Sequence, residues 1–362
     1  MKVSIILGTR PEIIKMSPII RELEKRGIDF FILHTGQHYS YNMDKIFFEQ
    51  LNLPKPKYNL EVGSGTHAEE TGRMLMGIEK VLQEERPDVI LVEGDTNTVL
   101  AGALAACKLQ IKIGHVEAGL RSYDREMPEE INRVLTDHVS DYLFAPTEKA
   151  KNNLLREGIS EKKIFVTGNT IVDAVYQNIK LAEENSNILE AIGVNDNDYF
   201  LVTIHRQENV DNIQRFRNIL EGLKLLHKEF DLPVIYPIHP RAKKRMQEYG
   251  LNNDSLTMIE PLDYLSFLQL ESKARLILTD SGGVQEEACI LKVPCVTLRY
   301  NTERPETLDV GANVIAGTEP VNILEKTRIM MGRSRSWENP FGDGRAAERI
   351  VNIINSQELC GL

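Results

Sequence analysis

Cysteine is scarce in this chain of 362 residues, which holds four of them and no Cys-x-x-Cys pair. This usage argues against a disulfide framework or a zinc module and predicts buried thiols in a reducing compartment at Cys107, Cys289, Cys295 and Cys360. Long apolar runs are also missing, and residues 1–5 enter a strand pattern without the layout of a signal peptide. We therefore expect a cytoplasmic protein with no membrane partner.

The chain has fewer positive than negative side chains, with 43 Lys and Arg residues, 53 Asp and Glu residues and a net charge of −10. This balance argues against nucleic acid as a partner and leaves anions to bind at helix N-termini and a few cationic side chains. The eight histidines are scattered. His34 and His38 do not share one helical face, so we expect no metal. The length and the 42% hydrophobic content suit two globular domains.

The most informative stretch is Asp280–Ala288, where an apolar run leads into Ser-Gly-Gly and then into a helical pattern. A helix that begins at Ser281, Gly282 and Gly283 presents unpaired backbone N–H groups, and glycine lets a bulky anion approach them. The turn therefore predicts a phosphate site, with Glu286 or Glu287 as an acceptor for nearby hydroxyl groups. The alternative is a capped turn followed by a solvated pair of glutamates.

In the first half, short apolar runs alternate with helical patterns, and the runs lie at residues 3–7, 30–33, 89–92, 111–116, 142–147 and 164–169. Polar side chains follow several of these predicted strands: Arg10 and Lys15 after the first, Asp95 and Glu117 after later ones, and Glu129 at a helix start. Each has a plainer alternative. Arg10 and Lys15 could be solvated cations, Asp95 an N-cap, and Glu129 a partner of the helix dipole.

The same scheme repeats in the second half, with runs at 200–204, 234–238, 276–279 and 295–298. We therefore predict an α/β fold of two facing, Rossmann-like, doubly wound parallel sheets with an interdomain cleft. The expected domains are residues 1–170 and 171–343, and a last helix within 344–362 could pack back on the first domain. Since parallel sheets bind ligands beyond the carboxyl ends of their strands, the polar clusters should line the cleft.

A phosphate site opposite several carboxylates suits a nucleotide-sugar, with the nucleotide on the second domain and the sugar facing the acids. The second domain supplies Ser281, Gly282, Gly283 and His205, with Arg304 as a further candidate. His205 ends a predicted strand and precedes Arg206. This position favours a role in ligand binding over that of an ordinary hydrogen-bonded histidine.

Seven motifs together carry a specific resemblance. They are Gly8-Thr-Arg-Pro-Glu12, Gly94-Asp-Thr96, His115-Val-Glu-Ala-Gly-Leu-Arg121, Pro128-Glu-Glu-Ile-Asn-Arg133, His205-Arg-Gln-Glu-Asn209, Asp280-Ser-Gly-Gly-Val-Gln-Glu-Glu287 and Thr302-Glu-Arg-Pro-Glu306. In this order and spacing the chain resembles the non-hydrolysing UDP-N-acetylglucosamine 2-epimerases over nearly its whole length. The resemblance implies a glycosyltransferase-B-type fold and a homodimer. It also implies interconversion of UDP-GlcNAc and UDP-ManNAc without a cofactor, supplying UDP-ManNAc for surface polysaccharides.

The resemblance also implies roles for particular residues. Asp95, Glu117 and Glu129 would be the acid/base group, with His205 among the catalytic residues. The diphosphate would be held by His205, Arg10, Ser281, Gly282 and Gly283. Glu287 would bind the ribose, Phe267 would stack near the uracil, Arg304 would stabilise the UDP side, and Lys15 would participate.

Some members of this family are activated by a second UDP-GlcNAc, and the matching positions here are Gln37, Arg73, Arg206 and His239. Where bacterial members have Gln-His-x-Gln, this chain has Gln37-His-Tyr-Ser40. Three other functions remain open: a UDP-sugar glycosyltransferase of the same architecture, a hydrolysing relative that releases free ManNAc, and a non-catalytic UDP-sugar sensor. Three carboxylates at strand ends favour elimination over transfer, and a sensor would not need all three.

Overall fold

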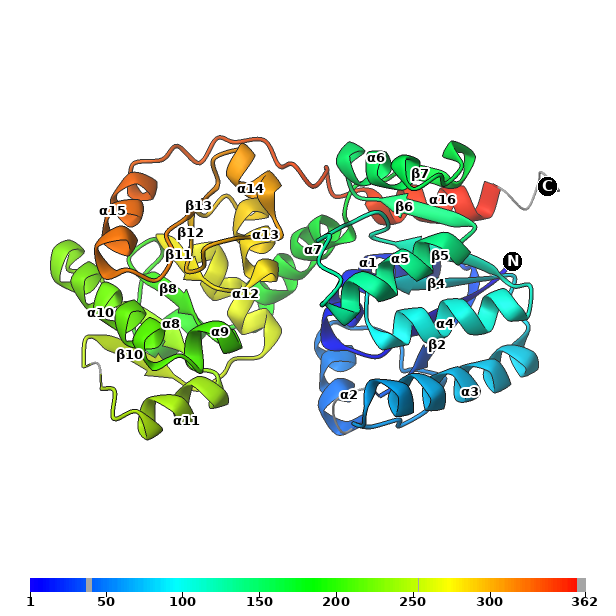
Figure 1. The fold of residues 1–362 in the computed structure, drawn as a ribbon, viewed down its shortest axis with the longest axis horizontal. Coiled ribbons are helices and arrows are strands. Elements are labelled where there is room, and N and C mark those ends of the chain that lie inside the picture. Colours follow the sequence, from blue (N-terminus) through cyan, green and yellow to red (C-terminus); the bar gives the residue numbers. More distant parts are fainter. Residues whose placement is uncertain (37–40, 253, 357–362) are drawn as a thin grey trace. The chain divides into compact units, whose positions relative to one another are not determined.

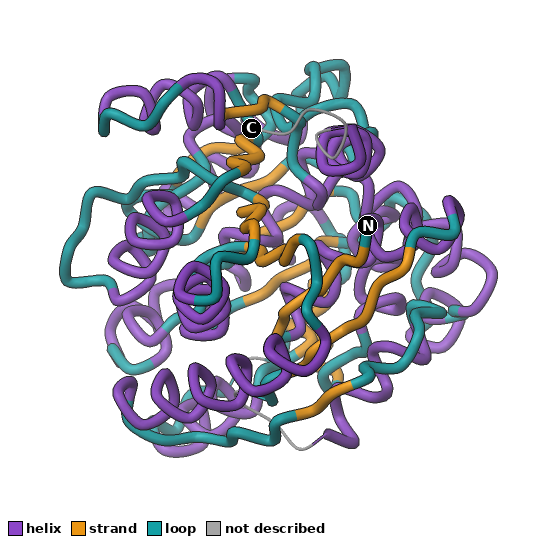
Figure 2. The backbone as a smooth tube through the Cα atoms, turned by 90° about the vertical axis from the view of Figure 1, so that its right-hand side faces the viewer, coloured by secondary structure: helices purple, strands orange, loops and turns teal. Residues whose placement is uncertain are grey.

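A computed structural model describes residues 1–36, 41–252 and 254–356, and the chain forms two compact units (Figure 1). Unit 1 comprises Met1–Gln177 together with the segment that begins at Phe341. Unit 2 is the continuous stretch Asn178–Pro340. Both are built from parallel strands that alternate with helices. Figure 2 distinguishes the helices from the strands by colour. The predicted fold class is therefore confirmed.

The sheet of unit 1 has seven strands in the order β3-β2-β1-β4-β5-β6-β7, and every pairing is parallel. The chain enters at the middle of the sheet and winds to one edge and then the other, so the strand order reverses between β1 and β4, the position where open parallel sheets bind ligands. The strands are β1 Lys2–Leu7, β2 Asp29–His34, β3 Tyr58–Asn59, β4 Val89–Glu93, β5 Lys112–Val116, β6 Tyr142–Ala145 and β7 Ile164–Val166.

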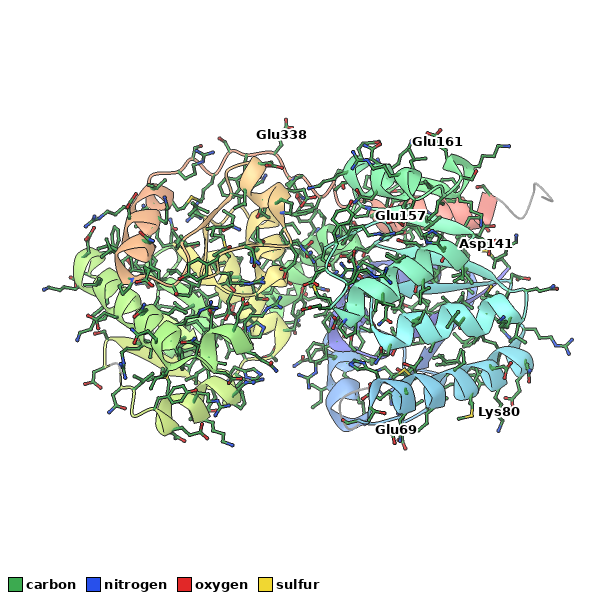
Figure 3. All side chains as sticks on the ribbon, viewed as in Figure 1. Glu69, Lys80, Asp141, Glu157, Glu161 and Glu338 are labelled. Atoms are coloured by element: carbon green, nitrogen blue, oxygen red, sulfur yellow. The ribbon has the colours of Figure 1, made fainter. Side chains whose placement is uncertain are left out.

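Helix α3 shows how a helix of unit 1 buries one apolar face. On α3, Met74, Ile78 and Leu82 are fully buried, whereas Glu69 and Lys80 point outward (Figure 3). This spacing of three to four residues is the signature of an amphipathic helix. The helices are α1 Arg10–Arg26, α2 Tyr41–Gln50, α3 His67–Glu85, α4 Asn97–Lys108, α5 Pro128–Val139, α6 Glu148–Arg156, the 3₁₀ helix η1 Glu161–Lys163, α7 Thr170–Asn185, which ends in unit 2, and α16 Ala346–Ser356.

Helix α16 completes unit 1 although it follows unit 2 in the chain. Asp173 on α7 accepts hydrogen bonds from the backbone N–H groups of Ala346 and Ala347 at 3.1 and 3.0 Å. The carboxylate thus satisfies donors that have no partner within the helix. Arg26 at the end of α1 donates to Asn352 at 2.6 Å, and Ile350 on α16 is fully buried.

The sheet of unit 2 has six parallel strands in the order β10-β9-β8-β11-β12-β13. These strands are β8 Phe200–Thr203, β9 Val234–Pro237, β10 Leu256–Ile259, β11 Leu276–Thr279, β12 Cys295–Thr297 and β13 Asn313–Ile315. The helices are α8 Ile188–Ile192, α9 Gln207–Val210, α10 Ile213–Phe230, α11 Pro240–Glu248, α12 Tyr264–Lys273, α13 Gly282–Ile290, α14 Pro305–Asp309 and α15 Pro320–Met331.

One sequence expectation about the thiols is wrong. Cys107 is exposed near the end of α4, whereas Cys289 and Cys295 are buried as expected. The remaining thiol, Cys360, lies outside the described residues. No helix in the part of the chain that the structure describes is long and apolar enough to cross a membrane.

Candidate active site

The carboxyl ends of β1, β4 and β5 lie side by side in the sheet of unit 1, and their loops carry a cluster of charged groups. Glu93 is the last residue of β4, and Glu117 follows β5 directly. Lys15 reaches the same place from α1. It pairs with Glu93 at 3.2 Å and with Glu117 in a closer contact. The structure therefore brings together two of the predicted residues, Lys15 and Glu117, with Glu93 as a third member.

Burial gives this cluster unusual protonation behaviour. The exposed fractions of Glu93 and Glu117 are 2% and 7%, and one ammonium group serves both carboxyl groups. Burial raises the pKa of Glu93 well above its usual value, because Lys15 offsets only part of the desolvation and Glu117 adds repulsion. Burial beside Glu117 therefore favours the protonated form of Glu93 more than that of an ordinary glutamate.

Glu12 is a second buried carboxyl group at this edge. It accepts hydrogen bonds from the N–H of Thr9 at 3.0 Å and from the hydroxyl of Thr96 at 2.5 Å. These bonds tie the start of α1 to the loop that precedes α4. Burial outweighs them and raises the pKa of Glu12 to about 7.

Asp95 is held from α5. Its carboxylate pairs with Arg133, and its backbone carbonyl accepts from Asn132 at 2.9 Å. The N-cap of α4 is Thr96 and not Asp95, so the plainer role considered for Asp95 does not apply. Glu129 lies on the first turn of α5 and is exposed. Arg133 thus holds Asp95 in the loop between β4 and α4, whereas Glu129 lies at the surface.

His115 fixes the two loops that carry these acids. Its Nδ1 lies 2.6 Å from Asp137, and its Nε2 lies 2.8 Å from the carbonyl oxygen of Gly94, which precedes Asp95. Asp137 also accepts from the N–H of Gly119 at 3.2 Å. Between these anchors Glu117 has a φ of 68°. That conformation is unfavourable for a residue with a side chain, and such strain is typical of functional loops.

Three other predicted residues of unit 1 have contacts of another kind or lie outside the description. The guanidinium of Arg10 stacks 4.9 Å from the centroid of the Phe47 ring. Arg73 on α3 donates to the carbonyl oxygen of Ser64 at 3.3 Å. Gln37 lies outside the described residues. The expected second UDP-GlcNAc site is therefore described only in part.

In unit 2 a hollow at the carboxyl ends of the strands collects several predicted residues. Its lining comprises Thr203, Ile204, His205, Pro237, His239, Pro261, Leu262, Phe267, Ser281 and Val284. Helix α13 begins at Gly282, and Ser281 caps it by accepting from the N–H of Val284 at 3.5 Å. The predicted strand, turn and helix are therefore present, with the helix N-terminus at one edge of a mostly apolar hollow.

Asp280, fully buried at the end of β11, organises this edge. It accepts hydrogen bonds from the backbone N–H groups of His205 and Arg206 at 3.1 and 3.0 Å, and from the side chain of Asn209 at 3.1 Å. Burial alone would raise the pKa of Asp280, but the imidazole of His205, with the N–H of Arg206 and the side chain of Asn209, outweighs burial and holds the pKa below its usual value. The carboxylate stays ionised and fixes the loop that carries His205.

Arg206 and His239 occupy equivalent places in unit 2, as the N-cap residues of α9 and α11. The rings of His205 and His239 lie 6.1 Å apart, centroid to centroid. Burial and the neighbouring His205 lower the pKa of His239. Two of the four residues predicted for a second ligand thus lie beside the hollow.

The two glutamates of α13 have separate partners and are not a solvated pair. Glu286 pairs with Arg304 at 2.7 Å. Glu287 accepts from the hydroxyl of Tyr264 at 3.1 Å and also contacts Glu271, a fully buried residue of α12. Burial, and then the charge of Glu287, raise the pKa of Glu271 well above its usual value. Burial next to Glu287 therefore favours the neutral form of Glu271.

Sequence reasoning missed Glu12, Glu93 and Glu271 as members of these clusters. Glu93 carried a usable signal, because it is a charged residue that directly ends a buried strand. Glu271 carried none, since a glutamate in a helical pattern is ordinarily solvated. Among the described residues no group of three or more His, Cys, Asp or Glu could hold a metal ion.

The two parallel sheets and their loop clusters define an α/β protein of the glycosyltransferase-B type. The family model described as UDP-N-acetylglucosamine 2-epimerase matches residues 21–355. The chain therefore belongs to the UDP-N-acetylglucosamine 2-epimerase family, and the resemblance seen in the sequence is confirmed.

Individual relatives agree with this assignment. The UDP-N-acetylglucosamine 2-epimerase of Methanocaldococcus jannaschii is 64% identical over 361 residues, which cover 98% of this chain and 99% of that protein. A crystal structure of the M. jannaschii UDP-GlcNAc 2-epimerase in complex with UDP-GlcNAc and UDP superposes with a TM-score of 0.88, covering 98% of this chain and all of that one at 64% identity. A UDP-2,3-diacetamido-2,3-dideoxy-D-glucuronate 2-epimerase of Pseudomonas aeruginosa is 43% identical, covering 98% of this chain and 99% of that protein.

Proposed function

We propose that this enzyme interconverts UDP-GlcNAc and UDP-ManNAc at C2 by eliminating UDP and adding it back. The observation that carries the proposal is the cluster of Glu93, Glu117 and Lys15, at the end of the strand that precedes Asp95, in a chain 64% identical to a UDP-N-acetylglucosamine 2-epimerase. A buried carboxyl group with a raised pKa beside a second carboxyl group suits acid/base chemistry at a carbon centre.

Elimination explains why the sugar needs this environment. C2–H is not adjacent to a carbonyl group, so a base alone cannot remove it. Departure of UDP from C1 builds positive charge on the ring and acidifies C2–H, and the two bonds are anti and axial in UDP-GlcNAc. The products, 2-acetamidoglucal and UDP, recombine after a proton returns to the opposite face of C2. Each face therefore needs its own acid/base group.

We assign the roles as follows. Asp95, Glu117 and Glu129 form the acid/base group, with Lys15 as a participant. Donors for the departing diphosphate come from Arg10, His205, Ser281, Gly282 and Gly283, with Arg304 on the UDP side. Phe267 and Glu287 contact uracil and ribose. The mostly apolar hollow that contains His205, Phe267 and Ser281 supports the nucleotide assignment.

We also propose that the enzyme is a cytoplasmic homodimer that supplies UDP-ManNAc for surface polysaccharides. Ile131 and Leu135 on α5 support the dimer, because their exposed fractions are 43% and 45% and they line a hollow with Tyr123. A second UDP-GlcNAc at Arg73, Arg206 and His239 would activate the enzyme. The contribution of Gln37 to that site rests on sequence alone.

Proton NMR of the purified protein with UDP-GlcNAc in D₂O tests the reaction. We expect UDP-ManNAc to appear, with deuterium at C2 of both sugars. Free ManNAc with UDP would identify a hydrolysing enzyme instead. No change would contradict the proposal and favour a transferase or a sensor. The assay is repeated with UDP-2,3-diacetamido-2,3-dideoxy-D-glucuronate, because a 43% identical relative is named for that sugar.

A further inference from the structure

Gly94, which follows β4 and precedes Asp95, is joined to β5 by two hydrogen bonds. Its N–H donates to the carbonyl oxygen of Val116 at 3.2 Å. Its own carbonyl oxygen lies 2.8 Å from Nε2 of His115. Since Val116 precedes Glu117, the backbone that leads to one assigned acid is fastened to the backbone that leads to the other. Of these two bonds, the one from His115 comes from a side chain.

Both ring nitrogens of His115 face groups that accept hydrogen bonds. A carbonyl oxygen has no hydrogen to donate, so Nε2 carries the hydrogen of its bond with Gly94. Nδ1 lies 2.6 Å from Oδ1 of Asp137. The other oxygen of Asp137 accepts from the N–H of Gly119 at 3.2 Å and pairs with Arg121 at 2.7 Å, and both contacts favour the carboxylate. An ionised carboxylate also only accepts, so Nδ1 carries a hydrogen as well.

The charges around this ring balance when it is an imidazolium. His115 is fully buried, and the exposed fraction of Asp137 is 1%. Arg121 shares its guanidinium between Asp137 at 2.7 Å and Glu157 at 2.6 Å. With His115 charged, the four groups are two cations and two anions. With a neutral ring they would carry a net negative charge, and the lone pair of Nδ1 would face a buried carboxylate oxygen.

Helix α5 supplies the anion, and it also contacts the loop of Asp95 directly. Asn132 donates to the carbonyl oxygen of Asp95 at 2.9 Å. Asp137, further along α5, reaches the same loop through His115. Two consecutive peptide carbonyls are therefore held from one helix, that of Gly94 through the imidazole ring and that of Asp95 by an amide.

We infer that His115 is a positioning residue that Asp137 holds as an imidazolium, and that its Nε2–H fixes the Gly94 carbonyl and with it the loop of Asp95. The inference rests on the proposed function, in which Asp95 and Glu117 serve C2 of the sugar. His115 acts through the backbone. It sets the position of one acid relative to the other, and proton transfer depends on that geometry.

Two conservative variants separate the two hydrogen bonds of the ring. The amide nitrogen of glutamine takes nearly the place of Nε2, so His115→Gln keeps a donor for Gly94. The amide nitrogen of asparagine takes nearly the place of Nδ1, so His115→Asn keeps a donor for Asp137 and loses the donor for Gly94. We expect His115→Asn to lower kcat by about 10- to 100-fold and His115→Gln to lower it clearly less, with KM nearly unchanged in both. A purely structural histidine would give folded variants with equal kcat.

The rate of UDP-ManNAc formation gives kcat and KM for each variant. His227→Asn is the matched control, because Nδ1 of His227 also lies near a backbone carbonyl oxygen, that of Leu232 at 2.9 Å, but in unit 2. It should leave kcat in place. Thermal unfolding of each variant establishes that it is folded at the assay temperature. Equal kcat in His115→Gln and His115→Asn would overturn the inference.

Nitrogen NMR of the chain with isotope-labelled histidine provides a readout that does not depend on turnover. The signals of His115 are those that are absent from His115→Gln. We expect both ring nitrogens to carry a hydrogen at neutral pH, and Asp137→Asn to leave a hydrogen on one of them, because the buried cation loses its anion. A ring with one hydrogen in the intact chain would overturn the inference, whether or not the variants fold. If the intact chain failed to exchange C2–H at all, the proposed function would fail, while the NMR signals would still decide the state of His115.

Discussion

The imidazole Nδ1 of His205 lies 3.2 Å from the carboxylate of Asp280, which is itself fully buried. Asp280 also holds the backbone on both sides of the peptide bond between His205 and Arg206. One carboxylate therefore sets both the orientation of the ring and the path of the loop that carries it.

Replacing Asp280 by Asn should weaken UDP binding by about 10-fold or more, as expected when buried donors lose their acceptor. The amide has one acceptor oxygen, and its NH₂ group would face the N–H groups of His205 or Arg206. Isothermal titration with UDP measures the change. Asp309→Asn, at an exposed position of α14, is the control and should bind UDP normally. Unchanged affinity in Asp280→Asn would mean that the loop does not contact the nucleotide.

Separate replacement of Asp95 by Asn, and of Glu117 and Glu129 by Gln, should abolish or strongly slow deuterium incorporation at C2. The expected loss is about 10²- to 10⁴-fold for a residue that transfers the proton. UDP affinity should persist, since the residues assigned to UDP in unit 2 are untouched. Full turnover in the exposed Glu129→Gln variant would remove that residue from the acid/base group. Full turnover in all three variants would refute the assigned roles.

Compared with the intact chain, the Glu271→Gln variant should lose less stability as the pH rises above 4.5. The pKa of Glu271 in the folded chain is above its usual value of 4.5, so the unfolded chain loses this proton first. The intact chain therefore loses stability above pH 4.5, where the unfolded state binds fewer protons than the native state. Glutamine cannot lose a proton, so it removes this pH-dependent loss of stability, and its amide keeps a donor for Glu287. Urea unfolding of both proteins above pH 4.5 measures the free energy of unfolding. Identical pH slopes of this free energy would show that Glu271 does not hold a proton.

His34 should have the opposite effect on the pH dependence of stability, because it destabilises the folded chain as the pH falls. Burial lowers its pKa to about 4 from the usual 6.5. Between these values the unfolded chain binds a proton that the folded chain does not, so stability falls as pH drops from 6.5 to 4. The loss reaches about 3 kcal/mol. His34→Asn should flatten the fall in urea midpoint over this range, and an unchanged slope would mean that His34 titrates normally.

Ile131→Glu with Leu135→Glu should produce a monomer if α5 forms the dimer interface. Carboxylates at two exposed apolar positions would have to be desolvated in the interface. Light scattering after gel filtration measures the mass. Val321→Glu on α15 is the control, because Val321 is 70% exposed and lies in unit 2. A dimer that survives the double substitution places the interface elsewhere.

The sequence predicted the parallel architecture because its buried strands are apolar runs that alternate with helical patterns. It missed β10 and β13, which are short edge strands of unit 2. Met258 in β10 is 42% exposed, so this strand carries no continuous apolar signal. The exposed Cys107 was also not predictable, because a thiol near a helix end shows no pattern that reports its burial.

The partners within the site were harder to predict than its position. The carboxyl ends of strands are visible in sequence, and Asp95, Glu117 and Ser281 were placed at them correctly. Contacts such as Lys15 with Glu117 join residues 102 positions apart, and only the packed structure reveals them. Protonation is harder still, because the raised pKa of Glu93 or Glu271 follows from burial beside another acid and not from residue type.

Helix α16 has a consequence for how the chain is made. Its buried face, which includes Ile350 and Ile354, belongs to unit 1, but the ribosome reaches it only after all of unit 2. A nascent chain that has just passed residue 340 therefore carries a unit 1 that lacks its apolar contacts with α16 and a unit 2 whose sequence is complete. Domains synthesised in order normally fold in order. Here the second unit can finish folding before the first, and a chaperone would find its binding surface on the older part of the chain.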